Sequence, residues 1–328
     1  MEYMPEINYS RLLDSANELV QNLKSRNINI PPGCSLLQSL DCLKQWLNND
    51  KLPSEKYLMI LRNSIGLGHL SILLNNSLNH NLIKNIEPHL RKLTERDPLF
   101  HYHYPRGYGR DLVFELFVAS GLAPYVSDLT MSQSDTGEAD LKFSFDNEEW
   151  CAECKILYEK PNSNGVDKQS AKVKKKLKKA IEQIEATKRD GIIILGLTQR
   201  IKHDVALKIN GNTIIASPSD ETVTAWYDQD LTRAMAEIGM ASMSDQTIAE
   251  LTDFMRHKKC IHTKGLFGFF HSICPVMQKT IISTMRPKGI FKMIAMGRFV
   301  KLSGDCQKAF SLAQCLNDSF RKILLDLT

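Results

Sequence analysis

The sequence predicts an α/β protein in which a central mixed sheet is flanked by helices. Three observations support this fold class. Segments with helical spacing follow one another over residues 1–100, helix and strand patterns alternate in the next region, and the end of the chain mixes both. We therefore expect a helical N-terminal domain (1–100), an α/β core (101–235) and a mixed α/β C-terminal region (236–328).

The first hundred residues carry the pattern of amphipathic helices. Leu12, Ala16 and Leu19 recur at helical spacing, and similar segments follow the Pro-Pro-Gly break at 31–33. The GLGHL stretch at 66–70 resembles half of a phosphate-binding glycine loop. No strand precedes it and the pattern around it is apolar and helical, so we interpret it as part of a helix.

The central region alternates between the two patterns of periodicity. A helical segment is followed by three strand-like segments, a long lysine-rich helix and a short, wholly apolar strand. After residue 200 we expect three more helices and one more strand. The expected core elements are 111–122, 125–132, 139–145, 149–157, 166–188 and 191–198, and the later ones are 224–239, 244–258, 264–276 and 305–327.

Ionisable residues interrupt two of the expected strands. Side chains alternate between the faces of a strand, so Glu153 and Lys155 share one face of theirs. A hairpin through the intervening Asp-Asn-Glu-Glu segment would bring Asp140 to the same place. On the preceding helix, Glu115 belongs to an otherwise apolar stripe and should point toward the sheet.

These side chains have the chemistry of a metal-assisted hydrolase. Glu115, Asp140 and Glu153 offer oxygen ligands for a hard cation such as Mg²⁺. Lys155 beside the ion would orient or help to deprotonate a water molecule. A cation held there would polarise a phosphodiester and stabilise the charge that develops on the leaving oxygen.

The spacing of the motif resembles that of the PD-(D/E)XK nuclease superfamily. Asp140 is followed by twelve residues and then by Glu153-Cys-Lys155, and the similarity extends over roughly residues 105–200. One difference is that Ala139 stands where the family motif has proline. The resemblance implies a restriction-endonuclease-like core.

The same resemblance implies roles for individual residues. Asp140 and Glu153 would be metal ligands, Lys155 the catalytic lysine, and Glu115 the carboxylate on the preceding helix. It further implies Mg²⁺ as the cofactor, with Mn²⁺ able to substitute, and DNA as the substrate more often than RNA. Restriction, repair, transposon processing and phage defence are all compatible settings.

Polar residues around the motif are candidates for binding nucleic acid. A glutamine extends the apolar stripe of the lysine-rich helix toward its start, and some family members carry glutamine at a similar place. The lysines could neutralise backbone phosphates, although such a run is also typical of a solvated helix face. Arginines lie among aromatic residues in a preceding loop, which alternatively packs the helical domain on the core. The candidates are Gln169, Lys172, Lys176, Lys179, Arg106 and Arg110.

Two cysteine groupings raise the question of zinc. Cys151 and Cys154 are three apart on an expected strand and so point to opposite faces, which argues against a shared metal. A second group has spacing that fits no standard zinc finger, and we favour uncoordinated side chains there. That group is His257, Cys260, His262, His271 and Cys274.

We therefore predict a metal-dependent nuclease that cuts DNA in preference to RNA. A catalytically silent nucleic-acid-binding or assembly subunit with the same fold is the alternative. A third interpretation makes Glu153 and Lys155 a surface ion pair, with Asp140 distant and Glu115 exposed. The chain is 43% hydrophobic and 24% charged, its net charge is +5, and no apolar run approaches a membrane span. We expect a cytoplasmic protein that has nucleic acid as its partner and can also bind a protein partner or form a homo-oligomer.

Overall fold

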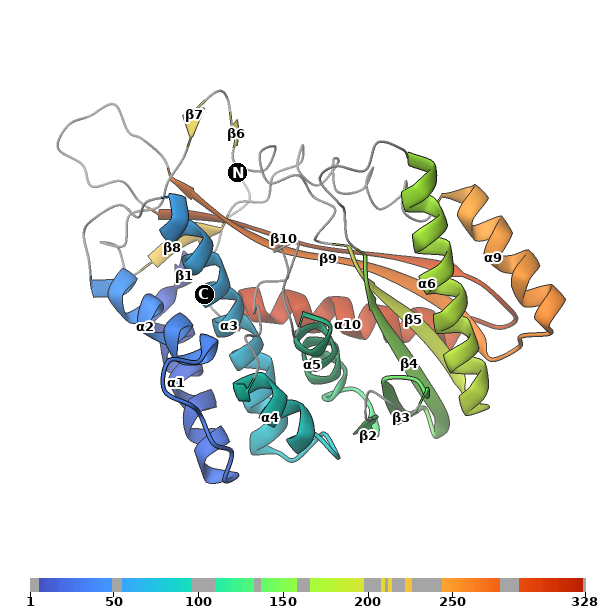
Figure 1. Ribbon diagram of the computed structural model, residues 1–328, viewed down its shortest axis with the longest axis horizontal. Helices are drawn as coiled ribbons and strands as arrows, with labels where there is room; N and C mark the ends of the chain where they lie inside the picture. The colour runs from blue at the N-terminus through green and yellow to red at the C-terminus, as the bar shows by residue number, and fades with distance from the viewer. Residues whose placement is uncertain are drawn as a thin grey trace.

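The structure is a computed structural model in which a mixed sheet is flanked by helices (Figure 1). It describes residues 6–48, 55–95, 110–132, 137–157, 166–197, 208–209, 212–213, 222–225, 244–277 and 289–326. The α/β class predicted from the sequence is confirmed.

The helices within the described ranges form two groups. Four precede the first long strand and pack on one another and on α5, while the others alternate with strands or end the chain. No described helix is long and apolar enough to cross a membrane. The helices are α1 (Tyr9–Ser25), α2 (Ser35–Asn48), α3 (Glu55–Asn79), α4 (Glu87–Glu95), α5 (Arg110–Leu122), α6 (Val166–Thr187), α9 (Asp245–Lys258) and α10 (Gln307–Asp326).

The described strands form one eight-stranded sheet and a separate two-stranded pair, β6 and β7. The order in the large sheet is β1-β8-β10-β9-β5-β4-β3-β2. β2, β3 and β4 form an antiparallel meander, and β5 then lies parallel to both β4 and β9. The strands are β1 (Glu6–Asn8), β2 (Ser127–Met131), β3 (Leu141–Phe145), β4 (Glu148–Ile156), β5 (Asp190–Gly196), β6 (Lys208–Ile209), β7 (Asn212–Thr213), β8 (Thr222–Ala225), β9 (Thr263–Met277) and β10 (Gly289–Lys301).

Strand alternation divides the apolar residues between two cores. On β5, Ile192 and Ile194 join the core beneath α1–α5 and α10, whereas Ile193 and Leu195 join the core beneath α6 and α9. Both sets are fully or almost fully buried, which explains the unbroken apolar run in this strand. The sheet is thus covered by helices on both faces.

The N-terminal helices share a core with the sheet. The first core runs from α1 to α10 and includes residues of β2, β3, β4, β5 and β9. The domain boundaries expected near residues 100 and 235 both lie outside the described residues. They stay a prediction.

The outcome differs by region. The expected elements at 111–122, 125–132, 139–145, 149–157, 166–188 and 191–198 are confirmed as α5, β2, β3, β4, α6 and β5, apart from shifts at their ends, and 244–258, 264–276 and 305–327 are confirmed as α9, β9 and α10. The helix expected from residue 224 is wrong at its start, because β8 ends at Ala225; the remainder, 226–239, lies outside the described residues. β1 and β10 were not predicted. The expectation of a wholly helical N-terminal region is wrong at its start, because β1 pairs with β8, which in turn lies parallel to β10.

Candidate active site

A tight hairpin places the key residues side by side. β3 and β4 are joined by Asp146 and Asn147, which have positive φ values of 48° and 61°. Positive φ at both central positions is the signature of a two-residue turn whose twist matches that of the flanking strands, and Asn and Asp tolerate it. The resulting register pairs Leu141 with Ala152 and so sets Asp140, which precedes β3, opposite Glu153.

The expected convergence of Asp140, Glu153 and Lys155 is confirmed. The backbone N–H of Asp140 donates to Glu153 Oε2 over 3.0 Å, and the backbone N–H of Cys154 donates to Asp140 Oδ2 over 2.7 Å. Lys155 Nζ forms an ion pair with Glu153 Oε1 and lies 3.9 Å from Asp140 Oδ2. The Glu153 side chain is fully buried. The interpretation of Glu153 and Lys155 as a surface pair remote from Asp140 is therefore wrong.

Glu115 joins this group from α5. Its side chain is only 18% exposed, as expected from its place on an apolar helix face. The negative charge of Asp140 acts on it strongly enough to shift its pKa. Glu115 Oε2 also lies 3.9 Å from Nε2 of His89, a buried residue of α4. The third carboxylate thus lies between the hairpin and the N-terminal helices.

The pKa values of Glu115, Asp140 and Glu153 are all raised above their ordinary values. Burial, followed by repulsion from Asp140, raises the pKa of Glu115 to about 8. Burial and the charge of Asp140 likewise raise the pKa of Glu153 to about 7. Burial also raises the pKa of Asp140, although Lys155 and the Cys154 amide oppose the shift. The positive charge of Lys155 is therefore too small to keep the pKa values of these three buried carboxyl groups at their ordinary level.

Lys155 supplies positive charge to the cluster. Burial alone would lower its pKa, but the charges of Asp140 and Glu153 outweigh this effect and raise the pKa above its ordinary value. The ammonium group is consequently protonated at neutral pH. A proton-donating lysine suits the orientation of a water molecule or a phosphate oxygen better than the removal of a proton.

The donor set has the chemistry of a Mg²⁺ site, although the ligands are not assembled around an ion. Mg²⁺ binds through one or two carboxylates and keeps several waters, and Asp140 and Glu153 are two carboxylates linked through a backbone hydrogen bond. Within the described ranges, no group of three or more His, Cys, Asp or Glu side chains forms a ready-made metal site. The expected three-carboxylate ligand set is therefore not preformed.

The predicted lysine contacts are described in part. Lys176 is half-buried, and its Nζ donates to the carbonyl oxygen of Ile156 over 2.9 Å, next to Lys155. Lys179 is exposed on α6. One lysine of the run therefore contacts the end of β4 while another faces solvent.

Four further candidates lie wholly or in part outside the described residues. The side chains of Gln169 and Lys172 in α6 and of Arg110 at the start of α5 lie outside the described residues, as does all of Arg106. Their proposed roles in substrate binding stay predictions.

Cys151 and Cys154 point to opposite faces of β4. Cys151 packs in the α6 core and Cys154 in the opposite core, as strand alternation predicts. Burial raises the pKa of Cys151 to about 12 and that of Cys154 well above its ordinary value, so both are neutral thiols.

The second candidate zinc group is only partly described. His257 is exposed on α9, Cys260 is half-buried, and His262 Nδ1 lies 3.3 Å from Asp190 Oδ1. The side chains of the two remaining members, His271 and Cys274 in β9, lie outside the described residues.

Two residues of the site were not predicted. His89 is 2% exposed, and its burial and the charge of Lys92 lower the pKa of its imidazole. The only signal in the sequence was a histidine on the apolar face of α4. Asp111, one turn before Glu115, also raises the pKa of Glu115.

Comparisons with known proteins add no further constraint. No family model, no curated protein and no solved structure matches the chain.

Proposed function

We propose that the protein is a metal-dependent nuclease that hydrolyses phosphodiester bonds, with DNA favoured over RNA. The observation that carries this proposal is the convergence of Asp140, Glu153 and Lys155 at the β3–β4 hairpin, with Glu115 within electrostatic reach. Buried carboxylates with a deficit of positive charge, beside a protonated lysine, fit a cation and a phosphate group together.

The order of elements supports a PD-(D/E)XK-like core. A helix, α5, precedes the antiparallel meander β2-β3-β4, and α6 then leads to β5, which lies parallel to β4. The motif residues lie at the start of β3 and near the end of β4, at the end of the hairpin that is remote from its turn. This is the arrangement that the resemblance of the sequence implies.

The chain's own residues suggest a division of tasks. Asp140 and Glu153 would hold the cation, which when bound supplies charge stabilisation at the scissile phosphate. Lys155 donates hydrogen bonds from its ammonium group and offsets negative charge on the substrate. Glu115, with a pKa of about 8, keeps its proton at neutral pH and suits either proton donation there or, once deprotonated, completion of the ligand set.

Cleavage assays on matched variants test the proposal. Wild type, Asp140→Asn and Lys155→Gln would be incubated with supercoiled DNA, linear DNA, single-stranded DNA and RNA, in Mg²⁺, in Mn²⁺ and in EDTA. We expect metal-dependent cleavage that falls by about 10²–10³-fold in Lys155→Gln and is lost in Asp140→Asn. The control is Glu138→Gln, which removes a charge from an exposed residue near the hairpin.

A catalytically silent nucleic-acid-binding or assembly subunit is the second candidate. Two observations favour it. Lys155 and Glu153 form an ion pair with each other, and no cluster of three potential metal ligands is present in the described ranges. Calorimetry with Mn²⁺ separates the two candidates. Binding that depends on Asp140, without cleavage, indicates a real site that needs a partner or effector. If no substrate is cleaved and no Mn²⁺ binding depends on Asp140, the nuclease proposal is refuted. We also propose that the protein is cytoplasmic and that it can bind a protein partner or a second copy of the chain.

A further inference from the structure

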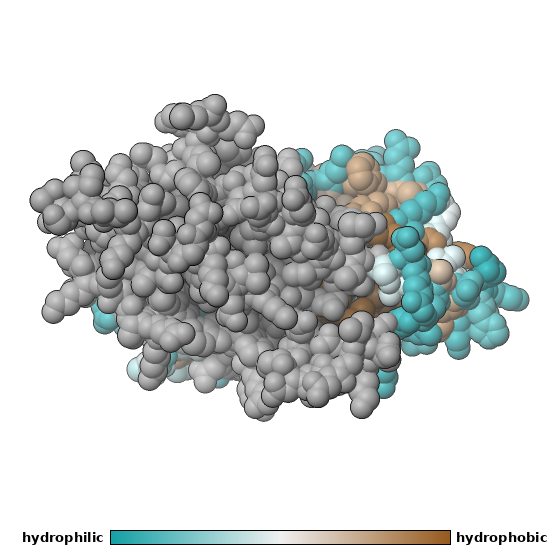
Figure 2. Space-filling model, turned by 90° about the horizontal axis from the view of Figure 1, so that it is seen from above, coloured by the Kyte–Doolittle hydropathy of each residue, from teal (hydrophilic) through white to brown (hydrophobic). Residues whose placement is uncertain are grey.

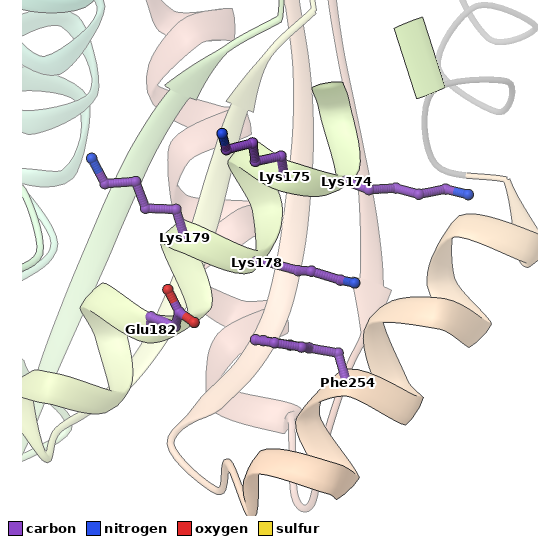
Figure 3. A pocket seen from close by; sticks show the side chains of 6 residues that line it. All are labelled: Lys174, Lys175, Lys178, Lys179, Glu182 and Phe254. Atoms are coloured by element: carbon purple, nitrogen blue, oxygen red, sulfur yellow. The ribbon is translucent and has the colours of Figure 1, made fainter. Parts of the chain in front are cut away.

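A basic groove lies between α6 and α9, on the sheet face opposite α5. Its volume is about 610 Å³, which is within the size range of ligand sites. The end of the molecule that carries these helices presents mainly hydrophilic residues with apolar residues between them (Figure 2). Four lysines, one glutamate and one aromatic residue line the groove: Lys174, Lys175, Lys178, Lys179, Glu182 and Phe254 (Figure 3).

The lysines of α6 form a continuous arc around the helix. Its buried stripe consists of apolar residues that pack on the sheet. Successive side chains of a helix are rotated by about 100° around its axis. This rotation places the lysines outside the buried stripe, in a fixed order around the helix from the side that faces α9 to the side that faces β4. That order is Lys174, Lys178, Lys175, Lys179 and Lys176.

Contacts at the two ends of the arc fix its position. Lys174 Nζ pairs with Glu250 Oε1 of α9 over 2.6 Å. At the other end, Lys176 Nζ reaches the carbonyl oxygen of Ile156, the residue after Lys155. The arc therefore leads from the groove to the candidate catalytic lysine.

The middle of the arc is available to a ligand. Lys175 and Lys179 are exposed, and neither has an ion-pair partner among the described residues. Lys178 Nζ lies 5.2 Å from the ring centroid of Phe254, which is half-buried on α9 (Figure 3). The groove thus combines exposed ammonium groups with an aromatic ring.

We propose that this groove binds single-stranded nucleic acid and guides it across α6 to the site at Lys155. The inference rests on the proposed function. Lys175 and Lys179 would contact successive phosphates, and Phe254 would stack on a base beside them. The ring selects for a single strand, because the bases of a duplex are already stacked on one another. Glu182, on the groove wall, opposes the phosphates and limits affinity.

The test is binding without cleavage. Fluorescence anisotropy of a labelled oligothymidylate would be measured over a series of salt concentrations in EDTA, so that no metal-dependent step occurs. The variant Lys175→Gln/Lys179→Gln should reduce the slope of log affinity against log salt by about 1.4, since each single-strand phosphate contact contributes about 0.7. Lys24→Gln, at an exposed position of α1, is the control and should leave the slope unchanged.

Two further variants test the sign of the charge and the role of the ring. Glu182→Gln should tighten binding, because it removes a negative charge from the groove wall. Phe254→Leu keeps the groove apolar without stacking, and should weaken single-strand binding by roughly 5- to 150-fold while leaving duplex binding unchanged.

Three results would overturn the inference: wild type that fails to bind the oligothymidylate, unchanged binding in the lysine variant, and equal loss of single-strand and duplex binding in Phe254→Leu. The test separates this inference from the proposed function. Binding in EDTA reports on the groove even if cleavage fails, whereas cleavage dependent on Asp140 reports on the site even if the groove variants bind normally.

Discussion

Replacing Glu115 with glutamine should change how the stability of the metal-free protein depends on pH. In the folded protein the pKa of Glu115 is about 8, against an ordinary value of 4.5. Between these values the unfolded chain releases its proton while the folded chain keeps it, so the free energy of unfolding falls as the pH rises. At about 1.4 kcal/mol per unit, this penalty reaches about 2–5 kcal/mol above pH 8. Glu115→Gln removes it.

Thermal unfolding from pH 5 to pH 9 measures the effect. The melting temperatures of wild type and Glu115→Gln should be similar at pH 5, and the variant should be higher by about 4–10 °C at pH 9. The control Glu182→Gln, at an exposed position, should follow the wild-type profile. If the Glu115→Gln and wild-type curves stay parallel across this range, the carboxyl group is not held in a buried acidic cluster and the argument fails.

Added Mn²⁺ should reduce or reverse the difference in melting temperature between wild type and Glu115→Gln at pH 9. The ion binds the carboxylate form, so it should raise the melting temperature of wild type more at pH 9 than at pH 5. Glu115→Gln should gain less if Glu115 is a ligand. An equal gain in both proteins would remove Glu115 from the metal site while leaving Asp140 and Glu153 in it.

Two substitutions outside the site test the packing of α6 on the sheet by urea unfolding. Glu185→Ala should lower the free energy of unfolding by about 2–3 kcal/mol, because its carboxylate accepts from the backbone N–H groups of residues 261–263; Glu185→Gln, which keeps one acceptor oxygen, should lose less, and equal stability of all three proteins would contradict this. Gly191→Ala should cost about 1–3 kcal/mol, since an added Cβ would lie 2.7 Å from both Cys151 Sγ and Ile184 Cγ2; no change in the unfolding midpoint would show that the strand shifts freely.

Local patterns predicted the part of the site that lies on adjacent strands. The alternation of side chains along a strand placed Glu153 and Lys155 on one face, and the short hairpin segment placed Asp140 beside them. Neither inference needed knowledge of distant contacts. The hydrogen bond from the Asp140 amide to Glu153 shows how closely the hairpin register fixes the two residues. The raised pKa values follow from the same burial, which the apolar flanks of the motif indicated.

Contacts between distant segments could not be predicted in the same way. A helix was expected from Thr224, yet Thr224 and Ala225 end the four-residue strand β8. The neighbours of this strand are β1, more than two hundred residues earlier, and β10, about sixty-five residues later. Hydrogen bonds from neighbouring strands override local preference in so short a segment. His89 was missed for a related reason, because its proximity to Glu115 depends on how α4 packs against α5.

That packing ties the N-terminal helices to the chemistry of the site. Glu115 keeps its raised pKa only while it is shielded from water, and part of the shield is α4, through His89. The first core continues from these helices into the sheet through Phe114 and Leu116 of α5. Removing α1–α4 would expose this apolar surface and admit water to Glu115, which would lower its pKa toward the ordinary value. The helices therefore belong to the structure that sets the proton affinity of the site, in addition to any role in recognising a partner.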